Sequence, residues 1–295
     1  MKDLAELHSQ LRPLMFSIAY RMLGTVTEAE DVVQEALLRL HNAPDSIDNP
    51  EAYAVTVTTR LAIDQLRSAR LRREHYVGPW LPEPLLTRRD ADDPATTAER
   101  ASDISLAVLV LLERLSPVER AVFVLREAFS YGYDDIAAIV QRTPANCRQL
   151  FRRARTHLHQ ESRRFEPSKA ERDALAGRFF RACADGDLEQ LERALAEEVT
   201  LFADGGGKAA AVRTPVRGRS RVARFLLGLF RYASANRLHL ERVLVNGQPG
   251  ARVMDPNGEV LAVLALDVAD GTVQSLFNVV NPDKLRHLAA LGRAT

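Results

Sequence analysis

Residues 133–160 read YDDIAAIVQRTPANCRQLFRRARTHLHQ, and this stretch decides the fold of the central part of the chain. Its apolar spacing predicts a short helix over Tyr133–Val140, a tight turn over residues 141–143, and a longer helix from Pro144 to about Gln160. Two helices joined by a three-residue turn have the spacing of a helix-turn-helix, although the turn has no glycine.

The second of these helices has an apolar stripe and a basic surface. Leu150, Phe151, Ala154 and Leu158 form the stripe. The rest of its surface carries arginine and amide side chains, the groups that read guanine and adenine edges in the major groove. A solvated basic face on an ordinary bundle helix is the alternative, which the preceding helix and turn disfavour. The residues expected to contact DNA are Asn146, Arg148, Gln149, Arg152 and Arg153.

The first 73 residues have a helical pattern throughout. Pro13 is expected to kink or restart the first helix. Thr27 and Glu30 predict a capping box at the start of a second helix, whose polar face carries Asp31, Gln34 and Glu35. A third helix is expected from Asn49-Pro50 to Arg73. The arginines along its C-terminal half are equally consistent with phosphate binding and with a solvated helix end that complements the dipole.

The helical pattern is absent from residue 76 to residue 103. Four prolines beside three aspartates predict an extended linker there. This linker contains the only tryptophan of the chain, Trp80, which is expected to dock within the molecule. Helices are expected to resume after Asp93-Pro94, and Ser116 with Glu119 predicts another capping box.

After Pro167 the pattern changes to that of an α+β domain. Helices are expected over residues 171–184, 187–197 and 220–232, and strands near 199–202, 240–245, 251–254, 260–268 and 272–280. This order predicts a curved antiparallel sheet with helices on one face. The glycine-rich segment at residues 204–208 does not fit a P-loop, because no G-x-x-x-x-G-K-[ST] pattern leads from a strand into a helix. A surface loop without a ligand is the alternative interpretation of that segment.

Composition excludes several classes of protein. With 46% hydrophobic and 27% charged residues, the chain is expected to be globular, and no apolar run approaches the ~20 residues of a membrane helix. The N-terminal residues do not resemble a signal peptide, so a cytoplasmic location without a membrane partner is expected. The two cysteines, Cys147 and Cys183, have no metal-type spacing and are expected to be buried. We expect neither a metal nor a cofactor.

The order of these segments resembles that of a sigma-70 family sigma factor of the extracytoplasmic-function (ECF, group IV) type. Residues 27–36, TEAEDVVQEA, look like the helix of sigma region 2 that binds the polymerase clamp. Residues 49–73 look like the helix that melts the promoter and reads the −10 element, although this helix offers Tyr53 and no tryptophan. Residues 115–123, 133–137 and 146–150 are similar to region 4, which reads the −35 element.

This resemblance covers nearly all of residues 1–165 and implies partners as well as site residues. The implied partners are promoter DNA and core RNA polymerase, through its β and β′ subunits. Polymerase contacts are assigned to Asp31, Gln34 and Glu35. Contacts to the −10 region are assigned to Tyr53, Arg60, Arg67 and Arg70, and contacts to the −35 region to the five residues of the helix-turn-helix given above.

Three further segments resemble those of one ECF subfamily with a fused SnoaL-like (NTF2-like) domain: WLPEP at 80–84, DGGGK at 204–208 and NPDKL at 281–285. In that subfamily the fused domain is thought to regulate the sigma factor in cis. The implied domains are region 2 (1–75), a linker (76–104), region 4 (105–165) and an NTF2-like cone (168–290). The implied regulatory residues are Trp80, Pro82, Asp204, Gly205, Lys208, Asn281, Pro282, Asp283 and Lys284.

The rival hypothesis is a small-molecule-binding or catalytic NTF2-like protein with a DNA-binding helical appendage. An NTF2-like cone can hold an acid or base in its pocket, and Asp204, His239, Asp267 and Asn278 are available for that role. The sequence does not bring any pair of them to one substrate atom. We therefore expect no enzymatic activity and no catalytic residue, whereas an unknown small ligand in the pocket stays open.

Overall fold

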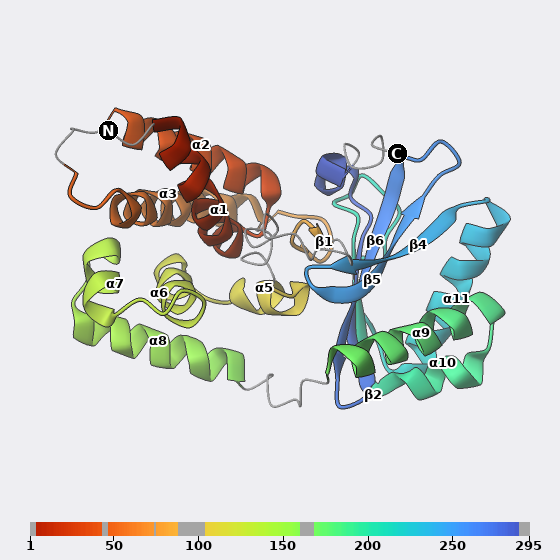
Figure 1. Cartoon of the computed structure of the whole chain (residues 1–295). Helices are drawn as coiled ribbons and strands as arrows, with labels where there is room; N and C mark the ends of the chain where they lie inside the picture. Colours follow the sequence, from red (N-terminus) through yellow and green to blue (C-terminus); the bar gives the residue numbers. More distant parts are fainter. Residues whose placement is uncertain (1–3, 43–46, 74, 88–103, 160–167, 289–295) are drawn as a thin grey trace. The chain divides into compact units, whose positions relative to one another are not determined.

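The computed structural model describes residues 4–42, 47–73, 75–87, 104–159 and 168–288 of the 295-residue chain. These residues form two compact units (Figure 1). The first unit contains the described residues up to 75 and residues 109–159. The second contains residues 76–87, 104–108 and 168–288, so the described part of the expected linker belongs to the unit of the C-terminal domain.

The first unit is helical, as predicted. Helices α1 (Leu4–Leu23), α2 (Val26–His41) and α3 (Pro50–Arg73) pack against one another. They are joined by α6 (Pro117–Glu127), α7 (Tyr133–Val140) and α8 (Pro144–His159), and α6 also packs on α1 and α3. Helix α5 (Leu106–Leu112) precedes α6 in the chain. Regions that the sequence assigns to two domains therefore lie in one compact unit.

Two details of the N-terminal helices differ from the sequence-based predictions. Helix α1 continues across Pro13, because its buried face packs against α2 and α3 and compensates for the lost backbone hydrogen bond. Helix α2 begins two residues earlier than expected, with Thr25 as the N-cap residue. Gly24 takes a left-handed conformation (φ 73°) that ends α1. The Thr25 hydroxyl then donates a hydrogen bond to the Glu28 carboxylate at 2.8 Å, so this turn determines where α2 begins.

The other predicted helix boundaries of this unit are confirmed. The Asn49 side chain accepts a hydrogen bond from the Ala52 amide (3.0 Å), and Ser116 and Glu119 form the predicted capping box. The helix-turn-helix has the predicted limits, and Gln141 takes the left-handed conformation (φ 54°) that a glycine would otherwise supply. The helix start predicted at Asp93-Pro94 lies outside the described residues.

The second unit combines three helices with a seven-stranded sheet of order β1-β4-β5-β6-β7-β2-β3. The helices are α9 (Lys169–Asp185), α10 (Leu188–Ala194) and α11 (Arg219–Ala235). A short 3-10 helix follows the last strand at Pro282–Lys284. The strands are β1 (Leu86–Thr87), β2 (Leu195–Asp204), β3 (Val216–Arg217), β4 (His239–Val245), β5 (Gln248–Met254), β6 (Val260–Ala269) and β7 (Thr272–Val279).

The sheet is mixed, and the prediction of a purely antiparallel sheet is wrong at one pair of strands. Strands β2 and β7 run parallel, with Leu201 opposite Leu276, because the long connection through α11 and four strands returns the chain in the same direction. The helix predicted over residues 187–197 ends earlier than expected, at Ala194. Pairing with β7 extends β2 back to Leu195, and tertiary pairing overrides the helical propensity of the alanine and glutamates there.

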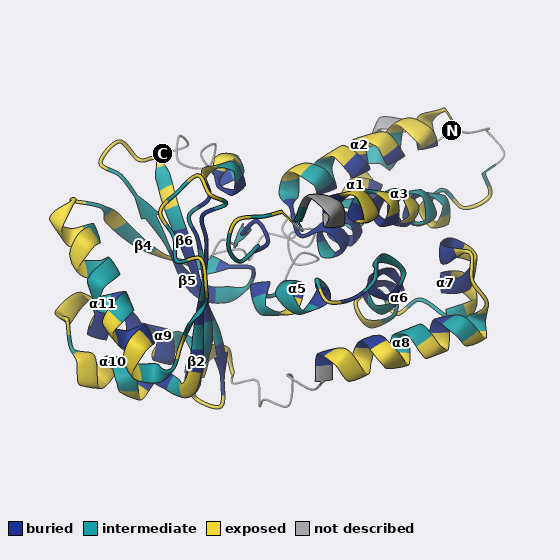
Figure 2. Cartoon of the chain, turned by 180° about the vertical axis from the view of Figure 1, so that it is seen from behind, coloured by how far each residue is buried: buried dark blue, intermediate teal, exposed yellow. Residues whose placement is uncertain are grey.

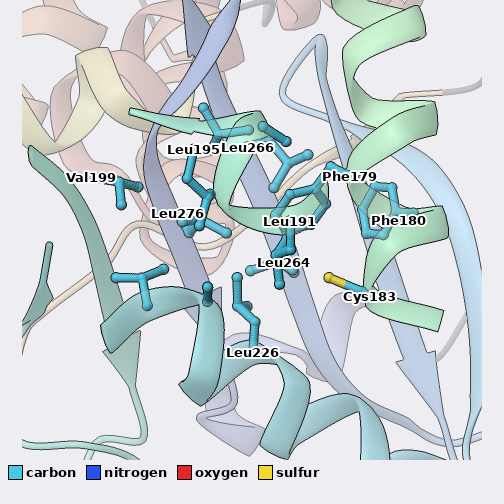
Figure 3. Close-up of a cluster of buried hydrophobic side chains, with 14 of the residues drawn as sticks. Phe179, Phe180, Cys183, Leu191, Leu195, Val199, Leu226, Leu264, Leu266 and Leu276 are labelled. Carbon is cyan, nitrogen blue, oxygen red and sulfur yellow. The ribbon is translucent and has the colours of Figure 1, made fainter. Parts of the chain in front are cut away.

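The core of this unit lies between the sheet and the three helices. Phe179 of α9, Leu191 of α10 and Leu226 of α11 point at buried side chains of the sheet such as Leu266 and Leu276 (Figure 3). The helices thus cover one face of a twisted, curved sheet, as predicted. Both cysteines are buried free thiols, and burial raises the pKa of Cys183 to about 12. No helix within the described ranges is long and apolar enough to span a membrane.

Candidate functional site

A buried carboxylate in the second unit gathers groups from segments far apart in the sequence. Asp204, at the end of β2, is fully buried. Its Oδ1 accepts a hydrogen bond from the Tyr76 hydroxyl at 2.6 Å, and its Oδ2 accepts one from the Leu81 amide at 2.8 Å. Its main-chain carbonyl accepts hydrogen bonds from the amides of Val280 and Asn281, both at 2.9 Å. The glycine-rich segment, the linker and the C-terminal segment therefore meet at one residue.

Lys284 completes this cluster as the positive partner. Its ammonium group is 2.7 Å from Asp204 Oδ2, and it also donates to the Leu81 carbonyl. It lies over two aromatic rings, 4.1 Å from the centroid of Trp80 and 5.0 Å from that of Tyr76. A lysine that is 5% exposed would be costly to bury alone. The carboxylate, the carbonyl and the two ring faces together compensate for its lost hydration. We call Tyr76, Trp80, Leu81, Asp204, Asn281 and Lys284 the linker clasp.

The glycines of residues 205–207 are explained by close packing around the clasp. A Cβ on Gly205 would collide with the Ala209 carbonyl and with Ala211. Gly206 has a positive φ of 56°, and a Cβ there would lie 2.8 Å from the Tyr76 hydroxyl and closer still to the Asn281 amide. Gly205 is needed because the loop packs closely on itself, and Gly206 because Tyr76 of the linker and Asn281 of the C-terminal segment press against it. The loop is therefore packed against the clasp through Gly206, while Gly207 and Lys208 are exposed at the surface.

The linker stays attached to the same unit beyond the clasp. His287 Nε2 lies 2.8 Å from the Pro84 carbonyl, and since a carbonyl only accepts, this nitrogen carries the proton. Burial lowers the pKa of His287, which favours its neutral form. Asn246 accepts a hydrogen bond from the Leu85 amide (2.9 Å) and donates one to the Ile104 carbonyl (3.1 Å). Strand β1 then pairs with β4. Both described ends of the linker are thus bound to the sheet of the second unit.

The predicted regulatory residues do not all belong to the clasp. Pro82 and Gly205 are buried beside it. Lys208 and Asp283 form a more exposed ion pair with each other, and Pro282 is exposed at the start of the 3-10 helix. Sequence reasoning missed Tyr76, Asn246 and His287. The only available signals were an aromatic residue at the edge of the linker and an Asn-Gly hairpin, neither of which indicates its partner.

A cavity of about 200 Å³ lies next to the clasp, lined by Val77 and Gly78 of the linker and by residues between Ala203 and Arg213. It is smaller than the ~300–1,000 Å³ typical of sites for drug-sized ligands. The four residues considered for acid–base catalysis do not gather there. Asp204 is engaged in the clasp, and His239 on β4 is separated from Asn278 on β7 by two strands, or about 14 Å.

In the first unit, the polar face of α2 is accessible. Asp31, Gln34 and Glu35 are all exposed, and Glu35 forms an ion pair with Arg39 at 2.8 Å. The same face carries Leu38, which is 58% exposed although it lies on a helix with a well-formed buried stripe. An apolar residue ringed by polar ones is typical of the centre of a protein–protein contact. Leu38 could have been found from the sequence as the leucine that falls off the apolar stripe.

The residues predicted to contact the −10 region have different environments. Tyr53 is half-buried, and Arg67 is exposed and paired with Asp64 at 2.9 Å. Arg60 is engaged, because its guanidinium donates to the carbonyls of Ala138 and Ile139 at the end of α7, both at 2.9 Å. Arg70 lies in α3, but its side chain is outside the described residues. Contact of Arg60 with DNA would therefore use its other Nη group or require the guanidinium to leave these two carbonyls.

Helix α8 presents its basic face to solvent. Arg148, Gln149, Arg152 and Arg153 are exposed, and Asn146 is half-buried. Arg148 lies over the ring of Tyr133 at 5.7 Å, and Arg153 is 3.6 Å from Glu119. The opposite face packs through the buried Cys147, Ala154 and Leu158, with Leu150 and Phe151 half-buried. The arrangement leaves Arg152 as an exposed arginine without an ion pair among the described residues.

A buried ion cluster connects α3 and α6. Glu113 forms ion pairs with Arg73 of α3 and with Arg120 of α6, whose side chain is only 1% exposed. Arg120 also donates to the Arg21 carbonyl (3.0 Å), and Arg73 donates to the Leu23 carbonyl (2.9 Å). Burial alone would raise the pKa of Glu113, but the two arginines outweigh it and hold this pKa below its ordinary value. We call this set the region 2–4 ion cluster.

Comparisons with known proteins agree with this architecture. The family models for Sigma-70 region 2 and for Sigma-70 region 4 match residues 7–72 and 105–158. The ECF RNA polymerase sigma factor SigJ of Mycobacterium tuberculosis is 40% identical over 292 residues, which cover 93% of this chain and 90% of that protein. A probable ECF sigma factor of the same organism, SigI, is 33% identical, with 95% of this chain and 93% of that protein covered.

The solved structures include the crystal structure of Mycobacterium tuberculosis SigJ, which matches with a TM-score of 0.78 and 35% identity. This match covers 96% of this chain and 98% of that one. The match includes the C-terminal unit, whose curved sheet with helices on one face agrees with the expected NTF2-like cone. The hypothesis of an independent NTF2-like protein with a helical appendage is not favoured. The chain belongs to the extracytoplasmic-function family of RNA polymerase sigma factors.

Proposed function

We propose that the NTF2-like domain of this sigma factor modulates promoter-specific transcription in cis by holding the linker between regions 2 and 4. Membership of the family makes core RNA polymerase and promoter DNA its partners. The observation that supports modulation in cis is the linker clasp, in which Asp204 and Lys284 bind the main chain of Leu81. We expect the protein to act in the cytoplasm, and its C-terminal domain to regulate without catalysing a reaction.

The physical basis of this proposal is a restraint on the chain that joins the two DNA-binding regions. Asp204 and Lys284 hold the linker near its start, and Asn246 holds both Leu85 and Ile104. A fused domain keeps such contacts populated at an effective concentration of roughly millimolar, so no separate partner is needed. Holding or releasing the linker would change how regions 2 and 4 are spaced on a promoter.

Two truncations test modulation in cis. Removal of residues 281–295 takes away Asn281 and Lys284 but leaves the sheet, so we expect release of the linker and a several-fold change in transcription in vitro. Removal of everything after Pro167 also takes away the support that the sheet gives to β1, and its effect should differ. Removal of residues 289–295 alone is the matched control, because it leaves every described contact in place. Equal transcription from all of these proteins would contradict the proposal.

We propose that Asp31, Gln34 and Glu35 contact core polymerase at the β′ clamp, with Leu38 at the centre of the contact and β contacts elsewhere in the chain. The double variant Asp31→Arg/Glu35→Arg should keep the fold, because both residues lie opposite the buried stripe, and should abolish holoenzyme formation. Asp185→Arg/Glu189→Arg, an equal charge change on exposed residues of the second unit, is the control. If the first variant binds core polymerase with near-normal affinity, the assignment of these α2 residues to the polymerase contact is wrong.

For the −35 region we propose base contacts by Arg152 and Arg148, supported by Asn146, Gln149 and Arg153. Arg152→Ala should cost about 1–3 kcal/mol of promoter binding and relax the preference at particular −35 positions. The measurement is holoenzyme binding to a set of single-base promoter variants at two salt concentrations. Uniform weakening on all sequences, together with a shallower salt dependence, would instead assign Arg152 to a phosphate.

A further inference from the structure

One stretch of the NTF2-like domain is basic and contains no acidic residue. Between Gly205 and Leu240 there are eight Lys or Arg residues and no Asp or Glu, in a stretch of 36 residues. At the average composition of this chain, about five acidic residues would be expected in that length. Seven of the eight basic residues are arginines. The whole chain has a net charge of only +1, so this stretch is a local feature and not a consequence of a basic composition.

Helix α11 presents part of this charge as one exposed stripe. Arg221, Arg224 and Arg231 are three and seven residues apart, which places them on one face of the helix, and all three are exposed. Figure 2 shows that α11 has exposed positions along its length. The opposite face is fixed in the core by Val222, Ala223 and Leu226. The three arginines span ten residues, or about 15 Å along the helix axis. We call Arg221, Arg224 and Arg231, with the exposed Tyr232 beside them, the α11 stripe.

Within the part of the chain that the structure describes, the stripe is not neutralised. Among the described residues, no carboxylate forms an ion pair with its arginines, whereas the neighbouring Arg219 pairs with Glu197 at 3.0 Å. The Nε groups of Arg224 and Arg231 donate to main-chain carbonyls one turn back, at 3.0 and 3.2 Å, which leaves their Nη groups available. Like charges three residues apart on a helix are mildly destabilising. A solvated surface helix normally interleaves acidic residues, and this one does not.

The chemistry of the stripe fits the phosphates of duplex DNA. Guanidinium groups bind phosphate oxygens in a bidentate manner, and Tyr232 adds a hydroxyl donor. The ~15 Å span covers about four phosphates of one strand, which follow at ~3.4 Å along the duplex axis. The exposed residues of α11 include no large aliphatic side chain that would suit a membrane surface or an apolar protein interface.

We propose that the α11 stripe binds the phosphate backbone of DNA, so that the NTF2-like domain contributes a third, sequence-independent contact beside those of regions 2 and 4. The family already supplies DNA as a partner. A contact made by a domain that is covalently attached to a DNA-bound protein is intramolecular, so three arginines are enough to add affinity. This goes beyond modulation through the linker, because α11 shares no residue with the clasp.

The test compares two triple variants of the full chain with equal charge change. Arg221→Gln/Arg224→Gln/Arg231→Gln removes the stripe, and Arg178→Gln/Arg181→Gln/Arg193→Gln removes three exposed arginines of α9 and α10. Binding to a fluorescein-labelled duplex of about 40 random base pairs is measured by anisotropy over a range of salt concentrations. The stripe variant should bind the duplex about tenfold more weakly than the parent does. Its plot of log K against log salt concentration should have a slope shallower by about 2.7, because each of the three lost phosphate contacts contributes about 0.9. The control should match the parent.

Three outcomes would overturn the proposal. Unchanged DNA binding by the stripe variant excludes a phosphate contact. An equal loss in both variants shows an effect of net charge alone. Normal DNA binding combined with weaker binding to core polymerase would show that the stripe faces an acidic protein surface. Holoenzyme formation and Trp80 fluorescence are measured in parallel, so a failure of the stripe proposal is distinguished from a failure of the clasp.

Discussion

Asp204→Asn is expected to lower the free energy of unfolding of the second unit by about 3 kcal/mol, because it leaves the Lys284 ammonium buried without its carboxylate. The amide keeps the shape of the side chain, so loss of charge is the main change. Trp80 is the only tryptophan and lies 4.1 Å from Lys284, so its fluorescence reports directly on this site. The measurement is denaturant unfolding of the full chain followed at Trp80.

The matched control is Asp283→Asn. Asp283 pairs with Lys208 in the same region, but both side chains are partly exposed, and such surface pairs contribute at most about 1 kcal/mol. The double variant Asp204→Asn/Lys284→Met should recover part of the loss, because no buried charge then lacks a partner. If Asp204→Asn lowers the free energy of unfolding no more than Asp283→Asn does, the clasp does not depend on this ion pair.

Glu113→Gln is expected to destabilise the first unit by a similar amount, about 3 kcal/mol, because Arg120 is almost fully buried and loses its carboxylate. Since the pKa of Glu113 is held below its ordinary value of 4.5, the folded state binds this proton less readily than the unfolded state. Its stabilisation is therefore complete above about pH 4.5 and is lost as the pH falls through the lower pKa of the folded state. The difference between parent and variant should shrink in acid.

Thermal unfolding at pH 7 and at lower pH measures this effect, and Asp64→Asn serves as the control. Asp64 pairs with Arg67 on the surface of the same unit, where loss of one charge should change stability by less than about 1 kcal/mol. The region 2–4 ion cluster joins α3 to α6, so Glu113→Gln should also loosen the packing that engages Arg60. Equal stability of parent and variant at pH 7 would contradict the importance of this cluster.

What the sequence predicts well is governed by interactions between residues close in the chain. The helix-turn-helix limits at Tyr133, Val140 and Pro144, and the caps at Asn49 and Ser116, depend on spacing and on side chains within one turn of the helix. The predicted start of α2 was two residues too late, because Thr25 with Glu28 and Thr27 with Glu30 have the same spacing in the sequence. The turn at Gly24 determines that Thr25 is the N-cap residue.

What the sequence predicts poorly depends on partners far away. The parallel pairing of β2 with β7, the bonds of Arg60 to α7 and the attachment of Leu85 through Asn246 join residues 70 or more positions apart. The segments at residues 80–84, 204–208 and 281–285 were singled out through the resemblance to a subfamily. Their contacts through Tyr76 and His287 leave no local pattern, because a buried tyrosine or histidine looks the same in sequence as any other.

Transcription in vitro with core polymerase tests modulation by the linker clasp most directly. The parent, Asp204→Asn and Asp283→Asn are compared at equal holoenzyme concentration on a promoter selected from a genomic library, with Trp80 fluorescence recorded for each. The account predicts that Asp204→Asn releases the linker and changes transcript yield several-fold, whereas Asp283→Asn transcribes like the parent. If Asp204→Asn alters Trp80 fluorescence and still transcribes like the parent, the clasp holds the linker without regulating the sigma factor, and the central claim is wrong.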